Sequence, residues 1–240
     1  MKVCVAGACG RMGRRIVELA IGEEGIEIGG AFEVSALAGT ELVAGHECGR
    51  PQKIVVSEDA AAELSNSDVL IDFTVAEACA AHVTLAAQLG KPAVVGTTGL
   101  SPAQQAALAA AAEAIPVVHA PNMSVGVNLL FKLTGEIARV LGLDYNVEIV
   151  ECHHNQKKDS PSGTALRLME RAAEALGLDP AQEVVHGREG LPGARPARQI
   201  GMHAVRGGDV VGEHTVSFIG QGERIELTHR AHSRDNFARG

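Results

Sequence analysis

Aromatic residues are scarce in this sequence, because its 240 residues include no tryptophan, one tyrosine and five phenylalanines. A core with so few rings has to be packed from alanine, valine, leucine and isoleucine. The hydrophobic fraction is nevertheless 46% and the charged fraction 21%, which is ordinary for a soluble globular protein. The length allows one large domain or two of modest size.

Positive charge is also in short supply. The 21 Lys and Arg stand against 29 Asp and Glu, which gives a formal net charge of -8 at pH 7. This balance argues against nucleic acid or an anionic membrane as the main partner. A site for an anionic ligand would therefore have to be a local basic pocket on an acidic protein.

Cysteines are few, and their spacing resembles no metal site or disulfide framework. The five are Cys4, Cys9, Cys48, Cys79 and Cys152, an odd number that we interpret as reduced thiols of a cytosolic protein. The chain enters a strand-like run at its second residue, without a signal-peptide pattern. No apolar run approaches the ~20 residues of a membrane span. We therefore expect a cytoplasmic protein without a metal or a membrane partner.

Short apolar runs alternate with helical patterns in the first half. Strands are expected over residues 2–6, 26–32, 53–56, 69–73, 93–96 and 117–120, and helices over 14–20, 77–89 and 102–114. Ser101 and Pro102 suit the N-cap and first position of the last of these helices. This alternation predicts a Rossmann-like α/β domain with a parallel sheet covered on both faces.

The pattern changes after Pro121. Helices are expected over 124–141 and 161–176, the second ending at Gly177, and strands over 145–152, 200–206, 210–219 and 223–231. Residues 179–199, rich in proline, glycine and charge, are interpreted as a long loop. These elements predict an α+β domain with a mixed or antiparallel sheet. The expected division is 1–123 with 234–240 for the first domain and 124–233 for the second.

A glycine-rich turn follows the first expected strand and opens a helix. Gly7, Gly10 and Gly13 give the spacing G-x-x-G-x-x-G, a variant of G-x-G-x-x-G. Glycines at such a turn let backbone N–H groups approach a pyrophosphate at the helix N-terminus. Glu33, twenty residues after Gly13, can take the ribose hydroxyls of a dinucleotide. The alternative is a turn that needs glycine for packing alone, with Arg11 as a solvated helix residue.

Two further strand ends carry polar residues. Gly96-Thr97-Thr98-Gly99 follows one expected strand, and Asp72-Phe73-Thr74 ends another. Ligands of open parallel sheets gather beyond the carboxyl ends of the strands, where two threonine hydroxyls could hold a nicotinamide carboxamide. Each cluster alone is also consistent with an ordinary turn, but the three strand ends together favour a ligand crevice.

The stretch ECHHNQKKDSPSGTA places several titratable residues at the end of a strand. Successive strand side chains point to opposite faces, so His153 can face a cleft while His154 packs or caps. Adjacent strand residues cannot chelate one ion together, which disfavours a metal site. Lys157 and Lys158 follow in a loop, where a lysine pair is usually solvated; its position here also suits an anionic substrate.

The same stretch then starts a helix, with Pro161 expected at its first position. Gly163 and Thr164 fall in the first turn, where unpaired N–H groups and the helix dipole favour a carboxylate. An ordinary capped helix explains Ser160 and Pro161 but not Gly163, because glycine costs ~1 kcal/mol relative to alanine in a helix. The chemistry implied is reduction of a small, carboxylate-bearing substrate, with protonation by a general acid.

Six stretches together resemble one family: VAGACGRMGR, DFT, GTTG, APNMSVGVN, ECHHNQKKDSPSGTA and VRGGDVVGEHTVSF. They are similar to the 4-hydroxy-tetrahydrodipicolinate (dihydrodipicolinate) reductases of diaminopimelate and lysine biosynthesis. The resemblance implies that His153 is the general acid, Lys157 its catalytic partner, and His154, Gly163 and Thr164 contacts of the substrate carboxylates. The implied cofactor-binding positions are Gly7, Ala8, Cys9, Gly10, Arg11, Met12, Glu33, Gly96, Thr97, Thr98, Ala120, Pro121, Asn122 and Met123.

The resemblance also implies reduction of a cyclic imine with NADH or NADPH, in a homotetramer assembled through the sheets of the second domain. Many members carry arginine directly after the acidic residue, where it can hold the 2′-phosphate of NADPH. Val34 stands there in this sequence, so we expect a tilt toward NADH unless a nearby residue such as Arg11 compensates. Members usually continue past the F-A-x-G segment with a helix, whereas this sequence stops at Gly240.

Two other functions compete with this interpretation. Another two-domain dehydrogenase, such as one acting on aspartate semialdehyde, would need a nucleophilic cysteine, and nothing around Cys152 supports that chemistry. A non-catalytic NAD(P)-binding regulatory module would keep the glycine loop. It would not need His153, Lys157 and the helix start at Gly163 and Thr164 together.

Overall fold

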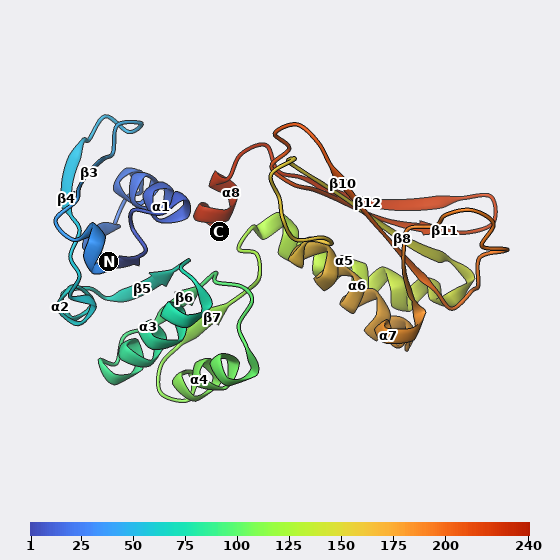
Figure 1. Cartoon of the computed structure of the whole chain (residues 1–240), viewed down its shortest axis with the longest axis horizontal. Helices are drawn as coiled ribbons and strands as arrows, with labels where there is room; N and C mark the ends of the chain where they lie inside the picture. The colour runs from blue at the N-terminus through green and yellow to red at the C-terminus, as the bar shows by residue number, and fades with distance from the viewer. The chain divides into compact units, whose positions relative to one another are not determined.

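The computed structural model describes all 240 residues, and they form two compact units (Figure 1). The first unit comprises Met1–Pro121 with Arg239, and the second comprises Asn122–Ala238 with Gly240. Residues 234–238 thus count with the second unit, whereas the sequence suggested the first. No helix combines the length and the apolar character needed to cross a membrane.

The first unit is built on a five-stranded parallel sheet, as predicted. Its order is β2 (Glu27–Phe32), β1 (Lys2–Ala6), β5 (Val69–Asp72), β6 (Ala93–Val95) and β7 (Val117–His119). The chain runs outward from β1 in one direction to β2 and in the other through β5, β6 and β7. The strand order therefore reverses beside β1, which is where open α/β sheets bind ligands.

Helices pack on this sheet because its strands are apolar on both faces. On one face, Cys4 and Ala6 of β1 join a core with α2 (Ala60–Ser65), α3 (Ala76–Gln88) and α4 (Pro102–Ala112). Val3 and Val5 point the other way, and α1 (Arg11–Gly22) contacts β1 and β2. Ser101 caps α4 in a capping box with Gln104, which confirms the predicted helix start.

The prediction misassigned one short element of the first unit and missed several others. The run expected at 53–56 is β4 (Gln52–Val55), which pairs antiparallel with β3 (Glu41–Ala44) in a separate hairpin. The hairpin strand β3, the helix α2 and the 3-10 turn η1 (Ser35–Leu37) were not predicted. Elements of three to six residues bury too few side chains to produce a readable period.

The second unit contains the predicted mixed sheet. Its order is β12 (Arg224–Arg230), β11 (Glu213–Ile219), β8 (Asn146–His153), β10 (Ile200–Arg206) and β9 (Val184–His186). β8 and β9 run parallel to β10, whereas β11 runs antiparallel to both β8 and β12. Alternation along β8 sends Val147 and Ile149 to the buried face.

Two long helices cover that buried face (Figure 1). They are α5 (Val125–Leu141) and α6 (Gly163–Leu176), and their leucines pack against β8, β10 and β11. Gly177 ends α6 in a left-handed conformation with φ of 62°, as expected for a glycine stop. Shorter helical turns are η2 (Gly142–Asp144), α7 (Pro180–Glu183) and α8 (Asp235–Arg239).

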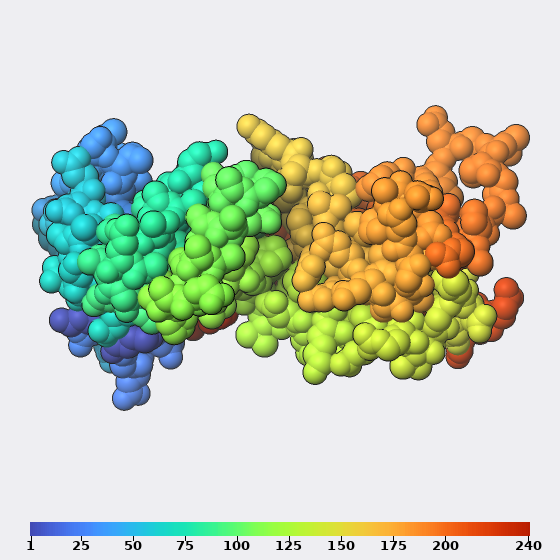
Figure 2. All heavy atoms as spheres, turned by 90° about the horizontal axis from the view of Figure 1, so that it is seen from below, coloured from blue at the N-terminus to red at the C-terminus, as the bar shows by residue number.

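Two predictions about the second unit were wrong. The stretch expected as a loop over 179–199 contains α7 and β9, which lie before Gly187. Only the remainder projects from this unit, where it is orange in Figure 2, and it carries the fully exposed Leu191. Pro161 is not the first residue of α6: Ser162 is the N-cap, and its hydroxyl accepts the Ala165 N–H at 3.2 Å.

Candidate active site

The glycine loop between β1 and α1 has the shape expected of a phosphate cradle. Gly7 has φ of 66°, and its N–H donates to the Phe32 carbonyl at 3.0 Å. A Cβ at Gly13 would lie 2.2 Å from the Gly7 carbonyl oxygen, so the helix can approach the loop only with glycine there. Gly10 is the N-cap of α1 and offers no side-chain cap. The first N–H groups of α1 therefore donate no hydrogen bond to a side chain of the N-cap residue.

Glu33 lies against this loop, as the spacing predicted. Its Oε1 accepts the Cys9 N–H at 3.2 Å and its Oε2 accepts the Val34 N–H at 3.1 Å. The Val34 side chain is 64% exposed. Arg14 donates its Nε–H to the Cys9 carbonyl at 2.8 Å, so this guanidinium supports the loop backbone.

A cavity of about 430 Å³ opens beside the loop. It is lined by Gly7, Gly10, Phe32, Glu33, Val34, Glu58, Ala60, Phe73, Thr74, Val75, Ala78 and His82. No lysine or arginine belongs to this lining. Its acidic lining residues are Glu33 and Glu58.

Asp72, at the end of β5, ties two of the predicted strand ends together. Its carboxylate is fully buried and accepts the Thr74 N–H at 2.9 Å, the Thr74 hydroxyl at 2.7 Å and the Thr97 hydroxyl at 2.9 Å. His82 Nδ1 donates to it at 2.7 Å. Burial acts to raise the pKa of Asp72, but the hydrogen bonds from His82 and Thr74 outweigh it and lower the pKa.

These contacts refine the positions expected at the GTTG cluster. The Thr97 hydroxyl donates to Asp72, whereas Thr98 is exposed. Gly96 faces the ring of Phe73, which a Cβ would meet at 2.1 Å. Ala120 follows β7, and its N–H donates to the Val95 carbonyl at 3.2 Å. Sequence reasoning missed His82, because a histidine inside an alanine-rich helix gives no pattern of its own.

In the second unit, Asn122 connects the residues before α5 to the start of α6. Its side-chain amide donates to the Thr164 hydroxyl at 3.1 Å, and its Oδ1 accepts the Ser124 N–H at 2.9 Å. Thr164 is buried, and Gly163 precedes it as the first residue of α6. A Cβ at Gly163 would meet no atom within 4 Å, so packing within the unit does not require glycine there.

His153 ends β8 next to a buried glutamate. Its side chain is almost completely buried, and its Nδ1 lies 2.5 Å from Glu151 Oε2. Arg206 makes two bonds to the same carboxylate, at 2.8 Å and 2.7 Å. Burial lowers the pKa of His153, and Lys157 and Arg206 add to this effect, together outweighing the opposite effect of Glu151.

A second histidine packs against His153. The His214 ring meets the His153 ring edge to face, with centroids 5.1 Å apart. Ser162 Oγ lies 3.0 Å from His214 Nε2, within hydrogen-bond distance, and the same oxygen accepts the Ala165 N–H. Burial, together with the charge of His153, lowers the pKa of His214 to about 3. His214 is therefore neutral at physiological pH.

The remaining predicted residues lie in the loop after β8. His154 is half-buried, and its N–H donates to the Val210 carbonyl at 2.8 Å. Lys157 forms an ion pair of 2.9 Å with Asp159, while Lys158 is exposed. Asp159 thus holds the Lys157 ammonium. No group of three or more His, Cys, Asp or Glu side chains is arranged to hold a metal ion.

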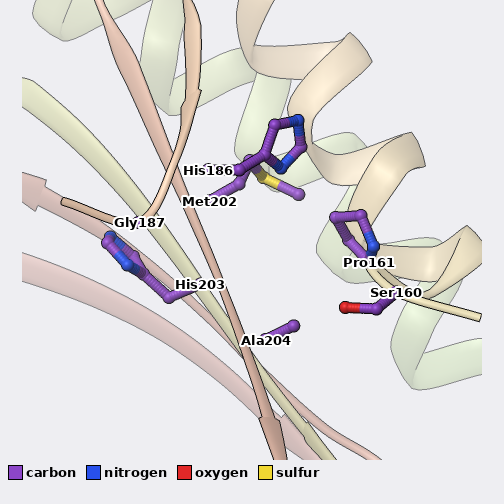
Figure 3. A pocket seen from close by; sticks show the side chains of 7 residues that line it. All are labelled: Ser160, Pro161, His186, Gly187, Met202, His203 and Ala204. Carbon is purple, nitrogen blue, oxygen red and sulfur yellow. The ribbon is translucent and has the colours of Figure 1, made fainter. Parts of the chain in front are cut away.

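A separate hollow of about 490 Å³ lies beside the chain that leads into α6. It is lined by Ser160, Pro161, His186, Gly187, Met202, His203 and Ala204. Figure 3 shows His186 next to Met202 and the Ser160 hydroxyl directed toward Ala204. None of the predicted site residues lines this hollow.

The fold and the two clusters define an oxidoreductase of the two-domain, dinucleotide-binding class. The N-terminal domain of dihydrodipicolinate reductase matches residues 1–123, and its C-terminal domain matches residues 126–240. The chain therefore belongs to the dihydrodipicolinate reductase family, which confirms the resemblance found in the sequence.

Individual relatives are similar over the whole chain. The 4-hydroxy-tetrahydrodipicolinate reductase of Anaeromyxobacter sp. (strain Fw109-5) is 53% identical over 241 residues, covering 100% of this chain and 89% of the relative. That of Syntrophotalea carbinolica is 51% identical, with coverages of 100% and 90%. The dipicolinate-bound dihydrodipicolinate reductase of Paenisporosarcina sp. TG-14 superposes with a TM-score of 0.78 at 27% identity, covering 100% of this chain and 91% of that structure.

Proposed function

We propose that this protein reduces 4-hydroxy-tetrahydrodipicolinate to tetrahydrodipicolinate in diaminopimelate and lysine biosynthesis, with NADH or NADPH as the reductant. The observation that carries the proposal is the buried Glu151–His153 pair beside the first turn of α6, in a chain of this family. A regulatory module that only binds a dinucleotide would have no use for that pair.

The first unit fits a nicotinamide dinucleotide. A Cβ at Gly13 would collide with the Gly7 carbonyl oxygen, and one at Gly7 would meet the Thr74 side chain at 2.8 Å. The first turn of α1 has no side-chain cap, and Glu33 lines the cavity. When bound, the nicotinamide supplies the hydride. We assign its binding to Gly7, Ala8, Cys9, Gly10, Arg11, Met12, Glu33, Gly96, Thr97, Thr98, Ala120, Pro121, Asn122 and Met123. The proposed dinucleotide domain keeps the bounds expected from the sequence, residues 1–123 with 234–240, although the contacts group 234–238 with the second unit.

We further propose that the enzyme favours NADH over NADPH. The cavity beside Glu33 has no basic lining residue, and Val34 stands where a cation would face a 2′-phosphate. The Glu33 carboxylate suits ribose hydroxyls and repels a phosphate. Arg11 is the nearby basic residue whose positive charge would act against this preference by attracting the 2′-phosphate of NADPH.

The proposed substrate domain is 124–233, with its anion site at the start of α6. The N–H groups of Gly163 and Thr164, the His154 ring and the Lys157 ammonium would bind the two substrate carboxylates. His153 donates the proton that must follow hydride addition to the conjugated double bond. The ion pair with Asp159 holds Lys157 until an anionic substrate competes for it.

A homotetramer assembled through the mixed sheet is also proposed. The sheet face opposite α5 and α6 carries Val150 of β8, Val205 of β10 and Ile219 of β11, and all three are exposed. Apolar residues on three adjacent strands favour a protein interface over a solvated surface. The cytoplasm is the proposed location, because that is where the pathway runs.

One assay tests the activity directly. The protein is mixed with NADH and freshly prepared 4-hydroxy-tetrahydrodipicolinate, and absorbance of the reduced cofactor is followed. Oxidation that depends on this substrate is expected, with aspartate semialdehyde as the control substrate. An absence of oxidation with either cofactor would refute the proposal.

A further inference from the structure

Glu151 accepts four hydrogen bonds beside His153, although it was not predicted from the sequence. Its carboxylate is 1% exposed and lies two residues before His153 on the same face of β8. Oε2 accepts the His153 Nδ1–H at 2.5 Å, and Oε1 accepts the Ser162 backbone N–H at 3.0 Å. One carboxylate thus contacts the proposed proton donor and the N-cap residue of the proposed anion site.

The first of these bonds decides which nitrogen of His153 is available. A carboxylate can only accept, so Nδ1 carries the hydrogen that it receives. Nε2 is then the nitrogen left for the substrate. Gly212 keeps that nitrogen accessible, because a Cβ at this position would lie 2.9 Å from Nε2. In the charged form of His153 the proton to be donated sits on Nε2.

Charged or titratable side chains from three other segments face this pair. Arg206 of β10 donates two hydrogen bonds to Glu151, and Lys157 lies in the loop after β8. His214 of β11 packs against the His153 ring. Arg206 and Lys157 oppose a positive charge on His153, and His214 is neutral. The Glu151 carboxylate is the only negative charge in direct contact with the His153 ring. The ring can therefore hold its proton only while Glu151 stays charged and in place.

We propose that Glu151 is a positioning residue that fixes the tautomer of His153 and, through Ser162, sets the first turn of α6 relative to the proton donor. This inference rests on the proposed role of His153 as general acid. Arg206 supports this arrangement, because its guanidinium keeps the buried Glu151 carboxylate ionised. Its Nη2 also donates to the Asp159 carbonyl at 2.8 Å, which ties the Lys157 loop to the same carboxylate.

The tautomer can be read in the unmodified protein by nitrogen-15 NMR of the histidine rings. The His153 signals are assigned by their loss in His153→Gln, since the chain has ten histidines. The neutral ring is expected to carry its hydrogen on Nδ1. A ring that carries it on Nε2 would overturn the proposal, whatever the activity of the enzyme.

Glu151→Gln tests the consequence for catalysis. The glutamine amide can offer an N–H to Nδ1, which moves the ring hydrogen to Nε2 and disfavours the charged ring. We expect kcat to fall by about 10²- to 10⁴-fold, the high-pH limb of the kcat profile to move to lower pH, and the Kd of NADH to stay unchanged. An unchanged profile, with only a lower melting temperature, would mean that Glu151 is structural and would reject the proposal.

Glu148→Gln is the matched control, because Glu148 lies on the opposite face of the same strand. It likewise holds Arg188 and His203, at 2.7 Å each. The variant is expected to leave the His153 tautomer and the pH profile unchanged. If Glu151→Gln fails to fold because Arg206 is left unpaired, the double variant Glu151→Gln with Arg206→Met removes both charges and should show the same loss of kcat. A kcat equal to that of the wild type in this double variant would contradict the inference.

The two hypotheses fail in different ways. If wild-type protein does not oxidise NADH with 4-hydroxy-tetrahydrodipicolinate, the proposed function is wrong, while the NMR result on the tautomer still stands. If the wild type is active but Glu151→Gln keeps wild-type kcat, the proposed function survives and the role of Glu151 is rejected.

Discussion

The two units each bury one carboxylate at a strand end, and in both cases a histidine Nδ1 donates to it. Asp72 holds His82 at 2.7 Å and Glu151 holds His153 at 2.5 Å. The other partners differ: Asp72 accepts from Thr74 and Thr97, whereas Glu151 accepts from a guanidinium.

The difference indicates two uses of the same motif. The hydroxyls of Thr74 and Thr97 make Asp72 a brace between the loops after β5 and β6, and the first of these loops lines the proposed cofactor cavity. The guanidinium of Arg206 keeps Glu151 charged beside a histidine that is proposed to carry and lose a proton. Variants of the two pairs should therefore affect different quantities, binding in the first unit and turnover in the second.

Removing the histidine of the second pair should have the largest effect. We expect His153→Ala to lower kcat by about 10²- to 10⁴-fold and to leave NADH affinity nearly intact, because the variant removes the proposed proton donor and leaves the proposed cofactor site unchanged. Steady-state kinetics and fluorescence titration with NADH measure the two quantities. His46→Ala, an exposed histidine in the first unit, is the control. Loss of NADH binding in His153→Ala would mean that His153 belongs to the cofactor site and that its assignment as proton donor is wrong.

Because His214, beside the second pair, is neutral in the folded protein, the stability of the fold should decrease in acid. Its folded pKa is about 3 against 6.5 for the free side chain, so below pH 6.5 the unfolded state binds a proton that the folded state does not. Stability must therefore fall as pH falls through that window. Between about pH 7 and pH 5 we expect a loss of about 2 kcal/mol from this residue.

Urea unfolding at the two pH values measures that loss. His214→Gln keeps an amide near Ser162 and removes the titration, so its stability should depend less on pH than that of the wild type. An equal pH dependence in both proteins would show that His214 is not held neutral.

Breaking the brace in the first unit should have a moderate effect on binding alone. Thr74 and Thr97 donate to Oδ1 of Asp72, and His82 donates to Oδ2. In Asp72→Asn an amide nitrogen, which cannot accept, replaces one of these oxygens, so either the threonine bonds or the bond from His82 is lost. We expect the Kd of NADH to rise about tenfold, equivalent to ~1.4 kcal/mol, with kcat at saturating NADH near wild type. Asp68→Asn, an exposed aspartate next to β5, is the control. A fall in kcat without a change in Kd would remove the distinction between the two pairs.

The smallest effect is expected at the edge of the cofactor cavity. Because Val34 is exposed, Val34→Arg should fold normally and add one solvent-screened contact to a 2′-phosphate. The ratio of kcat/KM for NADPH to that for NADH should rise about fivefold, equivalent to ~1 kcal/mol. A large NADPH preference already present in the wild type would contradict the predicted tilt toward NADH.

Residues that are close in sequence were predictable, and residues brought together by the sheet were not. The glycine loop, Glu33, His153 and the start of α6 carry local patterns whose physical meaning survives without the fold. Arg206 lies 55 residues from Glu151, and the two meet only because β10 pairs with β8. Glu151 itself lies two positions before His153, so strand alternation could have indicated it.

The most direct test of this account compares the rate of NADH oxidation with 4-hydroxy-tetrahydrodipicolinate in wild type, His153→Ala and His46→Ala under identical conditions. The account predicts substrate-dependent oxidation by wild type and His46→Ala, and a rate lower by about 10²-fold or more in His153→Ala. Equal rates in all three proteins would contradict the assignment of His153 as the proton donor.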